Sequence, residues 1–374
     1  MENNNDNKVL NVPHLRFPEF SGEWNKYTIN DLATVVGGGT PDTTVKSYWG
    51  GDIQWFTPSE IGKNKYVDFS KRTITRDGLD NSSAKLLPLH TILLSSRATV
   101  GECSIASNEC TTNQGFQSLI AKQCNIDFLY YLIQTKKKDL IRNACGSTFL
   151  EISANEIRKI KVAVPVQNEQ EQIAKLLSLI DERIATQNKI IEKLQSLIKG
   201  LAVALTTKEK ANIAISQCLE CHSSTLQESE VLSSGLCKVF GANGLVGYKD
   251  VPQMNGDAIL VIKDGSGVGT VSYAQGKFSV IGTLNYLTVI GNNDLRYLYF
   301  ALSVFNFQPY KTGMAIPHIY FKDYGKAKIY CPSLAEQKRV ANVLDKLESK
   351  LFVEQELLAS FNQQKLYLLG KMFI

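Results

Sequence analysis

The chain has 374 residues, of which 44% are hydrophobic and 21% charged, and its formal net charge is +5. These values fit a globular protein of two to three domains, with enough apolar residues for a core in each half. They exclude a histone-like polycation, and because no run of about 18 apolar residues occurs, we expect no membrane span.

The first segment, 24–164, alternates turn signals with short apolar runs. Asp52–Phe56 and Thr91–Ser95 predict strands. The apolar run that begins at Leu129 opens a helix, which we expect to continue through Lys136–Lys138. This segment, the first arm, is therefore expected to be a mixed α/β globule.

A long helix is predicted after the motif Pro165–Gln170. Apolar residues recur there with alternating steps of three and four, which is typical of a coiled-coil seam. The seam positions are Leu177, Ile180, Ile184, Gln187, Ile191, Leu194, Ile198, Leu201 and Leu205. A helix of roughly 33 residues would be about 50 Å long. The polar stretch Thr206–Lys210 follows as a linker.

The second segment, 213–331, repeats this plan. Asp257–Ile262 predicts a strand, and the glycines of Asp264–Gly269 predict a tight loop whose backbone amides could approach a phosphate. Leu295–Phe300 opens a helix. This second arm is followed by another heptad helix, with the seam Val340, Leu344, Leu347, Leu351, Glu354, Leu358, Phe361, Lys365 and Leu368.

An internal repeat relates the two halves. Val162–Gln170 resembles Ile329–Gln337, because both read apolar strand, Pro, short loop and Glu-Gln, at an offset of 167 residues (332 minus 165). Val100-Gly101 matches Val268-Gly269 at an offset of 168. Each half is thus expected to be an arm followed by a spacer helix.

The polar seam residues Gln187 and Glu354 stand at the same offset of 167. A polar residue in a seam commonly sets register and partner choice. If the two helices pair antiparallel, both residues fall near the middle of the coil and could face each other. The alternative is that both point partly to solvent.

Several motifs resemble those of the specificity subunits of type I restriction–modification enzymes. Leu15–Phe20 followed by Trp24 looks like the opening of these subunits, and Val239–Tyr248 resembles one type of their target-recognition domain. A second type of target-recognition domain has motifs similar to four segments of the first arm: Gly38–Pro41, Tyr48–Gly51, Ser95–Gly101 and Thr112–Phe116. The Pro…Glu-Gln modules are similar to the family's spacer helices, so the resemblance covers nearly the whole chain.

The resemblance implies an α+β fold with an internal pseudo-twofold repeat, in which two mixed α/β target-recognition domains are joined by two long helices that form an antiparallel coiled coil. The expected parts are an N-terminal tail (1–23), a first recognition domain (24–165), a central spacer helix (166–207), a second recognition domain (208–332) and a C-terminal spacer helix (333–374).

The implied function is sequence-specific binding of double-stranded DNA at a bipartite, asymmetric target. Modification (methyltransferase) subunits would then methylate adenine in the DNA. Restriction (nuclease-translocase) subunits would cut the DNA, as a defence against phage. S-adenosylmethionine, ATP and Mg are expected on those partners, and no cofactor is expected on this chain. The resemblance also implies a bacterial or archaeal cytoplasmic protein.

The motifs of the corresponding enzymes are missing from the sequence. No Pro-Pro is present for an amino-methyltransferase loop, and no Gly-Lys is followed by the Ser or Thr of a P-loop. The Glu-x-Lys sequences, Glu336 to Lys338 and Glu348 to Lys350, lie in the second heptad helix and the motif that opens it, not in an arm. We therefore expect no catalytic residue, which disfavours a self-contained DNA-modifying enzyme.

Affinity for DNA comes mainly from Lys and Arg on phosphates, and specificity from contacts to base edges. Candidate contacts in the first arm are Thr40, Gln54, Arg97, Thr99, Asn113 and Gln114. Candidates in the second arm are Asn243, Lys263, Ser266, Lys277 and Lys311. Arg pairs with guanine in the major groove, and Asn or Gln with adenine.

Each candidate has a structural alternative. Arg97 could form a structural salt bridge, Asn113-Gln114 could be a turn that satisfies its own backbone, and Asn243-Gly244 could be a hairpin turn. Trp49 and Trp55 are interpreted as core residues rather than base-stacking residues. For the whole chain, the alternative function is a coiled-coil scaffold that presents two binding modules and does not bind DNA.

The cysteines are scattered, and the polar N-terminus is no secretory signal, so we expect free thiols in a reducing cytoplasm. Cys218 and Cys221 form a C-x-x-C pair. A zinc site would need a second ligand pair at suitable spacing, which is not found. We expect no metal site and interpret these two as ordinary surface or half-buried thiols.

Overall fold

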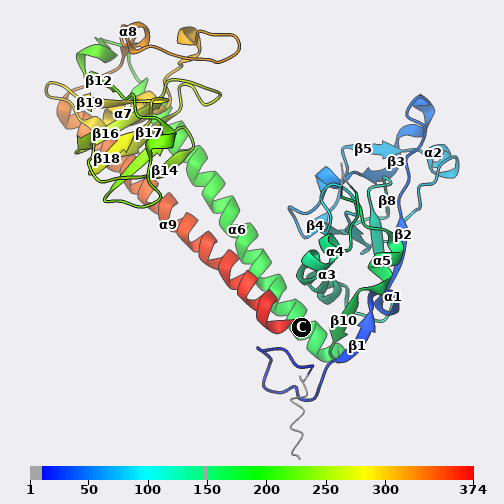
Figure 1. Ribbon diagram of the computed structural model, residues 1–374. Helices are drawn as coiled ribbons and strands as arrows, with labels where there is room; N and C mark the ends of the chain where they lie inside the picture. The colour runs from blue at the N-terminus through cyan, green and yellow to red at the C-terminus, as the bar shows by residue number, and fades with distance from the viewer. Residues whose placement is uncertain (1–10, 147–149) are drawn as a thin grey trace, which may run out of the picture. The chain divides into compact units, whose positions relative to one another are not determined.

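The computed structural model describes residues 11–146 and 150–374. It divides into two units: unit 1 comprises the described part of Met1–Thr186 together with Leu358–Ile374, and unit 2 is Gln187–Leu357. Of the tail expected over 1–23, residues 1–10 lie outside the described residues. Each unit contains one arm and a stretch of both long helices, α6 (Gln167–Thr206) and α9 (Leu334–Met372) (Figure 1).

The arm of unit 1 is built on three sheets. The largest has the strand order β2 (Ala33–Gly37), β9 (Gln117–Ala121), β6 (Ile92–Leu94), β7 (Cys103–Ala106) and β4 (Tyr66–Val67). The second has the order β5 (Arg72–Ile74), β3 (Trp49–Phe56) and β8 (Cys110–Thr112). The third pairs β1 (Asn25–Thr28) antiparallel with β10 (Lys161–Val164), which ties the start of the arm to its end. The two strands expected from the sequence are confirmed as β3 and β6.

The helices of unit 1 are short apart from α6 and α9, and they include α1 (Ile29–Leu32), α2 (Arg76–Asp80), α3 (Ile126–Thr135), α4 (Lys137–Arg142) and α5 (Ala154–Lys159). The prediction of a continuous helix through Lys136–Lys138 is wrong, because the helix is interrupted at Lys136, between α3 and α4. Its amide donates to Leu132 O and Ile133 O, which tightens the last turn of α3. Beyond the break, Leu140 is fully buried in the core. Tertiary packing therefore overrides the helical propensity of the lysine run.

The core of unit 1 draws on both ends of the described chain. Phe373 stacks on Phe128 of α3 with ring centroids 5.3 Å apart, and it meets Trp24 edge to face at 6.3 Å. Leu368 and Met372 of α9 are buried in the same cluster. The end of the second spacer helix thus completes the core of the first arm.

The arm of unit 2 follows the same plan. One sheet has the order β12 (Leu219–Ser223), β19 (Leu284–Val289), β16 (Ala258–Ile262) and β17 (Val271–Ala274). A second has the order β14 (Gly244–Lys249), β13 (Cys237–Gly241), β18 (Lys277–Val280) and β15 (Met254–Asn255). The third pairs β11 (Ile213–Ala214) with β20 (Lys328–Ile329), as β1 pairs with β10.

Helix α7 (Leu295–Ser303) takes the place of α3 in this arm, and α8 (Phe321–Tyr324) is a single turn. The strand over 257–262 and the helix that opens at Leu295 are thereby confirmed. The core of unit 2 includes the buried Ala202 of α6, with Leu201 and Leu205 packed against it.

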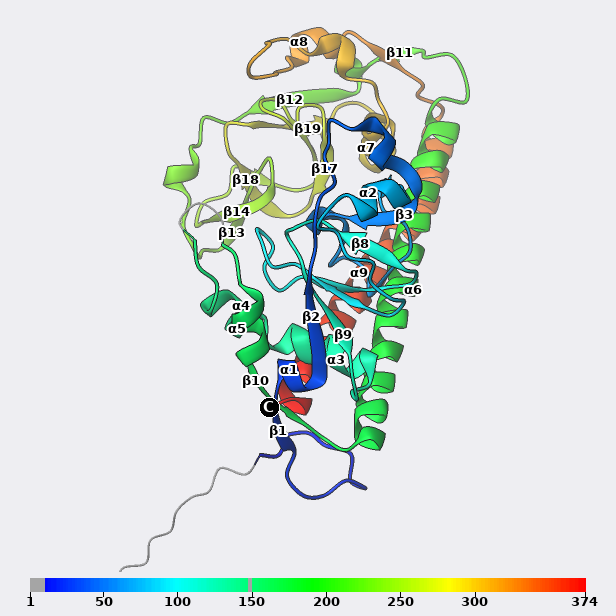
Figure 2. The ribbon, with the colours of Figure 1, turned by 90° about the vertical axis from the view of Figure 1, so that its right-hand side faces the viewer.

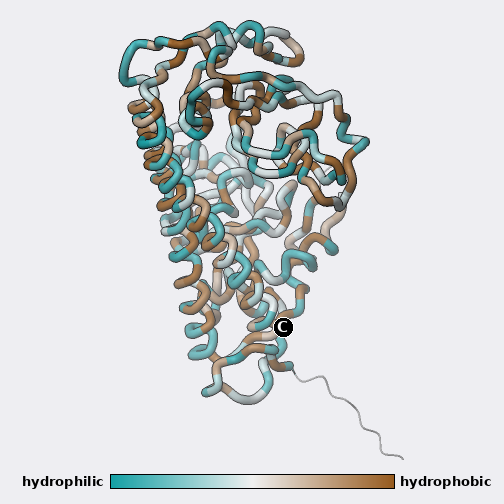
Figure 3. Tube along the Cα trace, turned by 90° about the vertical axis from the view of Figure 1, so that its left-hand side faces the viewer, coloured by the Kyte–Doolittle hydropathy of each residue, from teal (hydrophilic) through white to brown (hydrophobic). Residues whose placement is uncertain are grey.

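The spacer helices run antiparallel in both units. In unit 1, Lys365 Nζ of α9 lies 2.7 Å from Asp181 Oδ1 of α6, and in unit 2 Gln187 of α6 contacts Glu354 of α9. Every seam position is buried or half-buried, and Figure 3 shows hydrophobic and hydrophilic residues alternating along the helices. The helices have 40 and 39 residues, more than expected, because the polar turns before each seam are also helical.

The polar seam pair behaves as one buried contact. Gln187 Nε2 donates to the Glu354 carboxylate, and also to the Glu354 carbonyl oxygen at 2.9 Å. Gln187 is 5% exposed and Glu354 6%. The expectation that the two residues face each other is confirmed, and the alternative that they point to solvent is wrong.

Candidate nucleic-acid interface

Two loops pack side by side in each arm, and the same hydrogen bonds hold them in both. In the first arm, the amide of Ala98 donates to Leu150 O at 3.1 Å, and that of Ile152 donates to Ser96 O at 2.9 Å. In the second arm, at an offset of 167 for every residue, Gly265 donates to Pro317 O at 2.9 Å and Ile319 to Lys263 O at 2.9 Å. Figure 2 shows strands of both arms, among them β2 and β9 of the first and β12 and β19 of the second. The repeat therefore extends to the backbone bonds of the loops.

The second loop of each pair is closed by a backbone bridge. Cys145 and Glu151 exchange two hydrogen bonds of 2.9 Å, and Thr312 and His318 exchange bonds of 2.9 and 2.8 Å. Glu151 also bridges to Arg97, and His318 to Asp264, again at the offset of 167. The scaffold is thus common to both arms, whereas its side chains differ in charge.

The first loop of each pair needs left-handed backbone. Gly101 and Gly269 both have φ +88°, which glycine adopts without steric cost. The first arm also holds Ala98 at φ +64°, in a region that costs a residue with a Cβ roughly 1 kcal/mol. This turn leaves the neighbouring Arg97 side chain about half exposed.

A hollow of about 300 Å³ lies beside this turn in unit 1, and it is lined by Pro58, Arg97, Ala98, Asn113, Gln114 and Gly115. The Thr40 hydroxyl donates to Gln114 Oε1. The structure therefore gathers Thr40, Arg97, Asn113 and Gln114, four of the six candidates of the first arm, at one place.

The remaining two candidates of the first arm lie outside the lining. Thr99 shares a hydrogen bond of 2.9 Å with Ser95 in the turn itself. Gln54 lies on β3, where its Oε1 accepts from the Ser70 amide at 2.7 Å and from the Ser70 hydroxyl at 3.0 Å. The side-chain oxygen of Gln54 therefore binds Ser70 of this chain.

The structural alternatives apply in part. Arg97 Nε is 3.7 Å from Glu151 Oε2, too long for a hydrogen bond, and both side chains are about half exposed. Such an exposed pair contributes little and leaves the guanidinium available. Asn113 Oδ1 accepts from the Gly115 amide at 2.9 Å, so the turn alternative is confirmed for that oxygen.

Trp49 and Trp55 of the first arm pack together, with ring centroids 5.0 Å apart. Trp55 is buried, and its Nε1 donates to Gly39 O at 2.9 Å. Trp49 is half-buried, with the Arg72 guanidinium 3.5 Å from its ring centroid. The interpretation of Trp55 as a core residue is confirmed, and one face of Trp49 is covered by a cation.

The candidates of the second arm are divided between two places. Lys263 and Ser266 belong to the loop pair, and Lys311 directly precedes Thr312 of the bridge. Asn243 is exposed in the β13–β14 turn, where Gly244 has φ +97°, as the hairpin alternative expects. Lys277 begins β18 at the opposite end of that sheet, since β13 and β18 are parallel. The structure does not bring these last two together.

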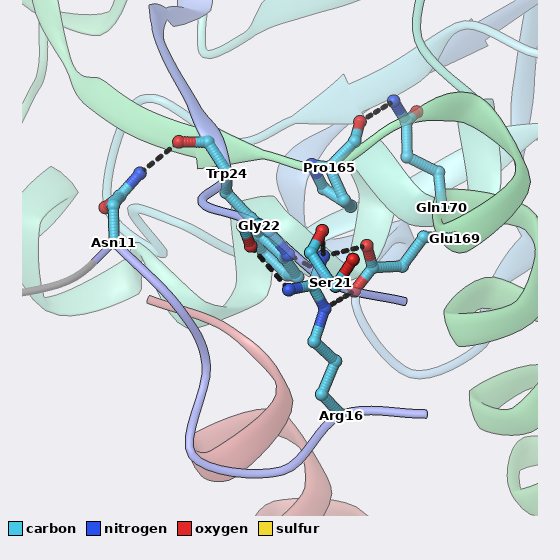
Figure 4. A network of polar contacts seen from close by, with 8 residues as sticks. All are labelled: Asn11, Arg16, Ser21, Gly22, Trp24, Pro165, Glu169 and Gln170. Carbon is cyan, nitrogen blue, oxygen red and sulfur yellow. Dashed lines mark hydrogen bonds and ion pairs between the residues drawn. The ribbon is translucent and has the colours of Figure 1, made fainter. Parts of the chain in front are cut away.

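The sequence reasoning overlooked a buried ion pair at the Glu-Gln motif (Figure 4). Glu169 is 0% exposed, and its carboxylate accepts from Arg16 Nη2 at 2.7 Å, from Arg16 Nε at 2.8 Å and from Trp24 Nε1 at 3.2 Å. Burial of a lone charge would be costly, so this pair fastens the segment before β1 onto the start of α6. The repeat of Glu-Gln could not have revealed it, because Arg16 and Trp24 belong to the opening segment that precedes the first copy alone.

The neighbouring glutamine joins each arm to its spacer. Gln170 Nε2 donates to Pro165 O at 2.9 Å, and its Oε1 accepts from the amide of Asn125, the residue before α3, at 3.0 Å. In unit 2, Gln337 donates to Pro332 O at 2.8 Å and accepts from the amide of Asp294, the residue before α7, at 2.8 Å. The same side chain orients the arm helix in both copies.

A tyrosine makes a second joint in each unit, buried in the case of Tyr131 and half-buried in the case of Tyr299. Tyr131 Oη donates to Asp181 Oδ2 at 2.7 Å in unit 1, and Tyr299 Oη donates to Glu348 Oε1 at 2.8 Å in unit 2. Burial, reinforced by the carboxylate, raises the pKa of both phenols. Asp181 and Glu348 stand at the offset of 167, so the recognition arms are held to their helices by equivalent contacts.

The cysteines are all free, as expected. Cys218 is fully buried beside β12, which corrects its interpretation as a surface or half-buried thiol, whereas Cys221 is half-buried. Among residues 11–146 and 150–374, no group of three or more His, Cys, Asp or Glu is placed to hold a metal ion. In the same ranges, no helix is both long and apolar enough to cross a membrane.

Comparison with known proteins points to one family. The family model described as type I restriction modification DNA specificity domain matches residues 21–196 and 222–363. The MjaIX specificity subunit of Methanocaldococcus jannaschii is 39% identical over 183 residues, which cover 46% of this chain and 42% of that protein. This match spans less than half of the relative's length. The EcoprrI specificity subunit of Escherichia coli is 24% identical over 360 residues, which cover 87% of this chain and 88% of that protein.

Solved structures show the same fold. The S subunit of a type I restriction–modification system from M. genitalium superposes with a TM-score of 0.66 at 20% identity, over 97% of this chain and 99% of that one. A chain from a study of complex assembly in the type I system has a TM-score of 0.57 at 14% identity, over 93% and 97%. The expected α+β fold, with two repeated arms and an antiparallel pair of spacer helices, is confirmed.

Proposed function

Because the chain belongs to the family of type I restriction modification DNA specificity domains, we propose that it is the sequence-specific DNA-binding subunit of a type I restriction–modification enzyme. Its recognition domains span 24–165 and 208–332, and its spacers span 166–207 and 333–374. Each arm reads one block of base pairs, and a gap of unread base pairs separates the two blocks.

One observation carries this proposal: the two arms share a loop scaffold and differ in the side chains mounted on it. Arg97 beside Glu151 in the first arm corresponds to Asp264 beside His318 in the second. Base pairs are distinguished by the donors and acceptors that meet their edges, so arms with different polar groups read different sequences. A repeated scaffold with divergent side chains fits a bipartite, asymmetric target.

The proposal assigns affinity to contacts with phosphates. Lys263, Lys277 and Lys311 in the second arm and Arg97 in the first offer cations at or near the surface. Neutralising phosphates releases counterions, so binding should weaken steeply as salt rises. A coiled-coil scaffold that does not bind DNA would show no such dependence.

Catalysis is assigned to partners. Methyltransferase subunits dock along the spacer helices and bring S-adenosylmethionine, and nuclease-translocase subunits bring ATP and Mg. Exposed apolar side chains on α6 and α9 support a docking surface, because large apolar groups in water usually mark an interface. They include Leu179, Leu197, Phe352, Val353, Leu366 and Tyr367.

The test is methylation mapping in a host that expresses this chain with its modification subunit. We expect N6-methyladenine at a split motif with two short blocks around a fixed gap. Exchange of residues 24–164 for another first arm should rewrite one block and leave the other unchanged. A chain that co-purifies with the methyltransferase but directs no motif would contradict the proposed function, and a chain that binds neither partner nor DNA would favour the scaffold.

A further inference from the structure

In the hollow of the first arm, each side-chain amide oxygen already accepts one hydrogen bond, whereas the side-chain nitrogens are available as donors. The oxygen of Asn113 already accepts from the Gly115 amide, and that of Gln114 accepts from the Thr40 hydroxyl. What remains along the lining is the amide nitrogen of each side chain and the guanidinium of Arg97. Within the described residues, no hydrogen bond uses these nitrogens.

A surface of donors selects a ligand with adjacent acceptors. In the major groove, guanine presents N7 and O6, both acceptors, whereas adenine presents N7 beside the N6 amino donor. An adenine placed here would turn its amino group toward the guanidinium and leave donors unpaired. An unpaired buried donor is costly, so the hollow discriminates against adenine.

Phosphate oxygens are also acceptors, and the second arm separates the two possibilities. Both arms meet the same sugar-phosphate backbone, so a phosphate clamp should occur on both copies of the shared loop scaffold. Asp264 stands where Arg97 does, at the offset of 167, and residues 280–282 hold Val, Ile and Gly in place of the Asn-Gln pair. The donors of Arg97, Asn113 and Gln114 are therefore specific to the first arm. This is expected of groups that contact bases, because the two arms read different sequences.

We propose that this hollow reads a guanine in the block of the target recognised by the first arm, with the Arg97 guanidinium donating to O6 and N7. The amide nitrogens of Asn113 and Gln114 complete the acceptor-selective lining. This inference rests on the proposed function and gives one letter of the target that the sequence could not.

The experiment uses the full chain in complex with its modification subunits, and a duplex that carries the mapped target. Each guanine of the first-arm block is replaced in turn by 7-deazaguanine, which lacks the N7 acceptor, or by inosine, which keeps N7 and O6. For the wild type, we expect 7-deazaguanine at one position to weaken binding about tenfold, and inosine at that position to leave it unchanged.

The variant Arg97→Ala should weaken binding to the unmodified duplex by a similar factor and be insensitive to 7-deazaguanine at that position. Arg76→Ala is the matched control, because it removes an exposed cation of the same arm, which pairs with Asp80 four residues away on the same helix. It should retain both the affinity and the sensitivity to 7-deazaguanine. Thermal unfolding of each variant confirms that the arm is folded, and Arg97→Lys replaces Arg97→Ala if it is not.

Three results would overturn the inference. The first is a first-arm block without guanine. The second is an Arg97→Ala variant that weakens binding equally on all sequences and lowers the salt slope by about 1, which identifies a phosphate contact. The third is a wild-type complex without any sequence preference, which would overturn the proposed function as well, whereas the first two leave that function standing.

Discussion

The Glu-Gln motif occurs twice, and its two copies differ in one residue's role. Glu169 is 0% exposed and is held by Arg16 and Trp24, whereas the Glu336 side chain is 35% exposed and pairs with Arg339, three residues along α9. Both glutamines make the same bonds to the preceding proline and to the arm helix.

The difference has a simple cause. Only the first copy is preceded by a segment that carries Arg16 and Trp24, while the corresponding stretch before the second copy is part of α6. A repeated sequence motif therefore fixes the contacts made within its own repeat, and the contacts to unrepeated segments decide the rest.

The largest difference between the two copies is expected when the cation that pairs with Glu169, Arg16, is removed. Arg16→Ala would leave the buried Glu169 carboxylate with only the Trp24 donor, and we expect a loss of ~3 kcal/mol in the free energy of unfolding of unit 1. Glu336→Ala should change stability by less than about 0.5 kcal/mol. Urea denaturation of the full chain measures both, and equal effects would show that the two glutamates are equivalent after all.

The tyrosine joints should behave alike where the glutamates do not. Tyr131→Phe and Tyr299→Phe each remove the hydrogen bond from a phenol to a carboxylate and keep the ring. Tyr131→Phe also removes two longer bonds of 3.4 Å, from Lys65 Nζ and to Ser178 Oγ, which are too long to add much. We expect each to cost ~1.5 kcal/mol, since a bond to a charged group is worth about 1.5–3 kcal/mol. A difference well beyond experimental error would mean that Lys365 beside Asp181 and Arg296 beside Glu348 compensate unequally.

The smallest expected effect on overall stability comes from changes in the seam. These changes should instead affect whether the two helices adopt a single register and a single association state. Replacing both members of the polar pair, Gln187→Leu with Glu354→Leu, should allow the helices to slip in register or associate with other chains. Cross-linking between engineered cysteines on α6 and α9, together with light scattering, would detect this. An unchanged register and oligomeric state would refute a role for the pair in setting register.

The same variant should lose an acid sensitivity. Lys350 first, and Gln187 second, lower the pKa of Glu354. A depressed folded-state pKa contributes stability above the ordinary value of 4.5, which is lost as the pH falls below it. The wild type should therefore weaken between pH 5 and pH 3 by more than the double variant, in unfolding curves recorded at a series of pH values.

The periodicity of the sequence predicted the structure well in the heptad helices and in the internal repeat. The spacing of the seam predicted both long helices, and the offset of 167 predicted the meeting of Gln187 with Glu354. The break at Lys136 was missed because it depends on where Leu140 fits in a core built from distant strands. Local propensity does not contain that information.

The candidate site was predictable only as a set of polar residues. Motifs singled out Arg97, Asn113 and Gln114, but Pro58, which lines the same hollow, begins the short 3-10 helix Pro58–Glu60, which no motif marked. The sequence also could not tell that the Asn113 oxygen is occupied by a backbone amide. The donor character of the hollow, on which its proposed selectivity depends, emerges only from that geometry.

The position of Phe373 in the first core has a consequence for how the protein is made. On the ribosome, residues 24–164 emerge well before Leu368, Met372 and Phe373, which belong to the same core. Domains usually fold as units in the order of synthesis. Here the arm that is translated first cannot complete its core until the end of α9 has also been made, and until then the apolar surface around Trp24 and Phe128 lacks this cover.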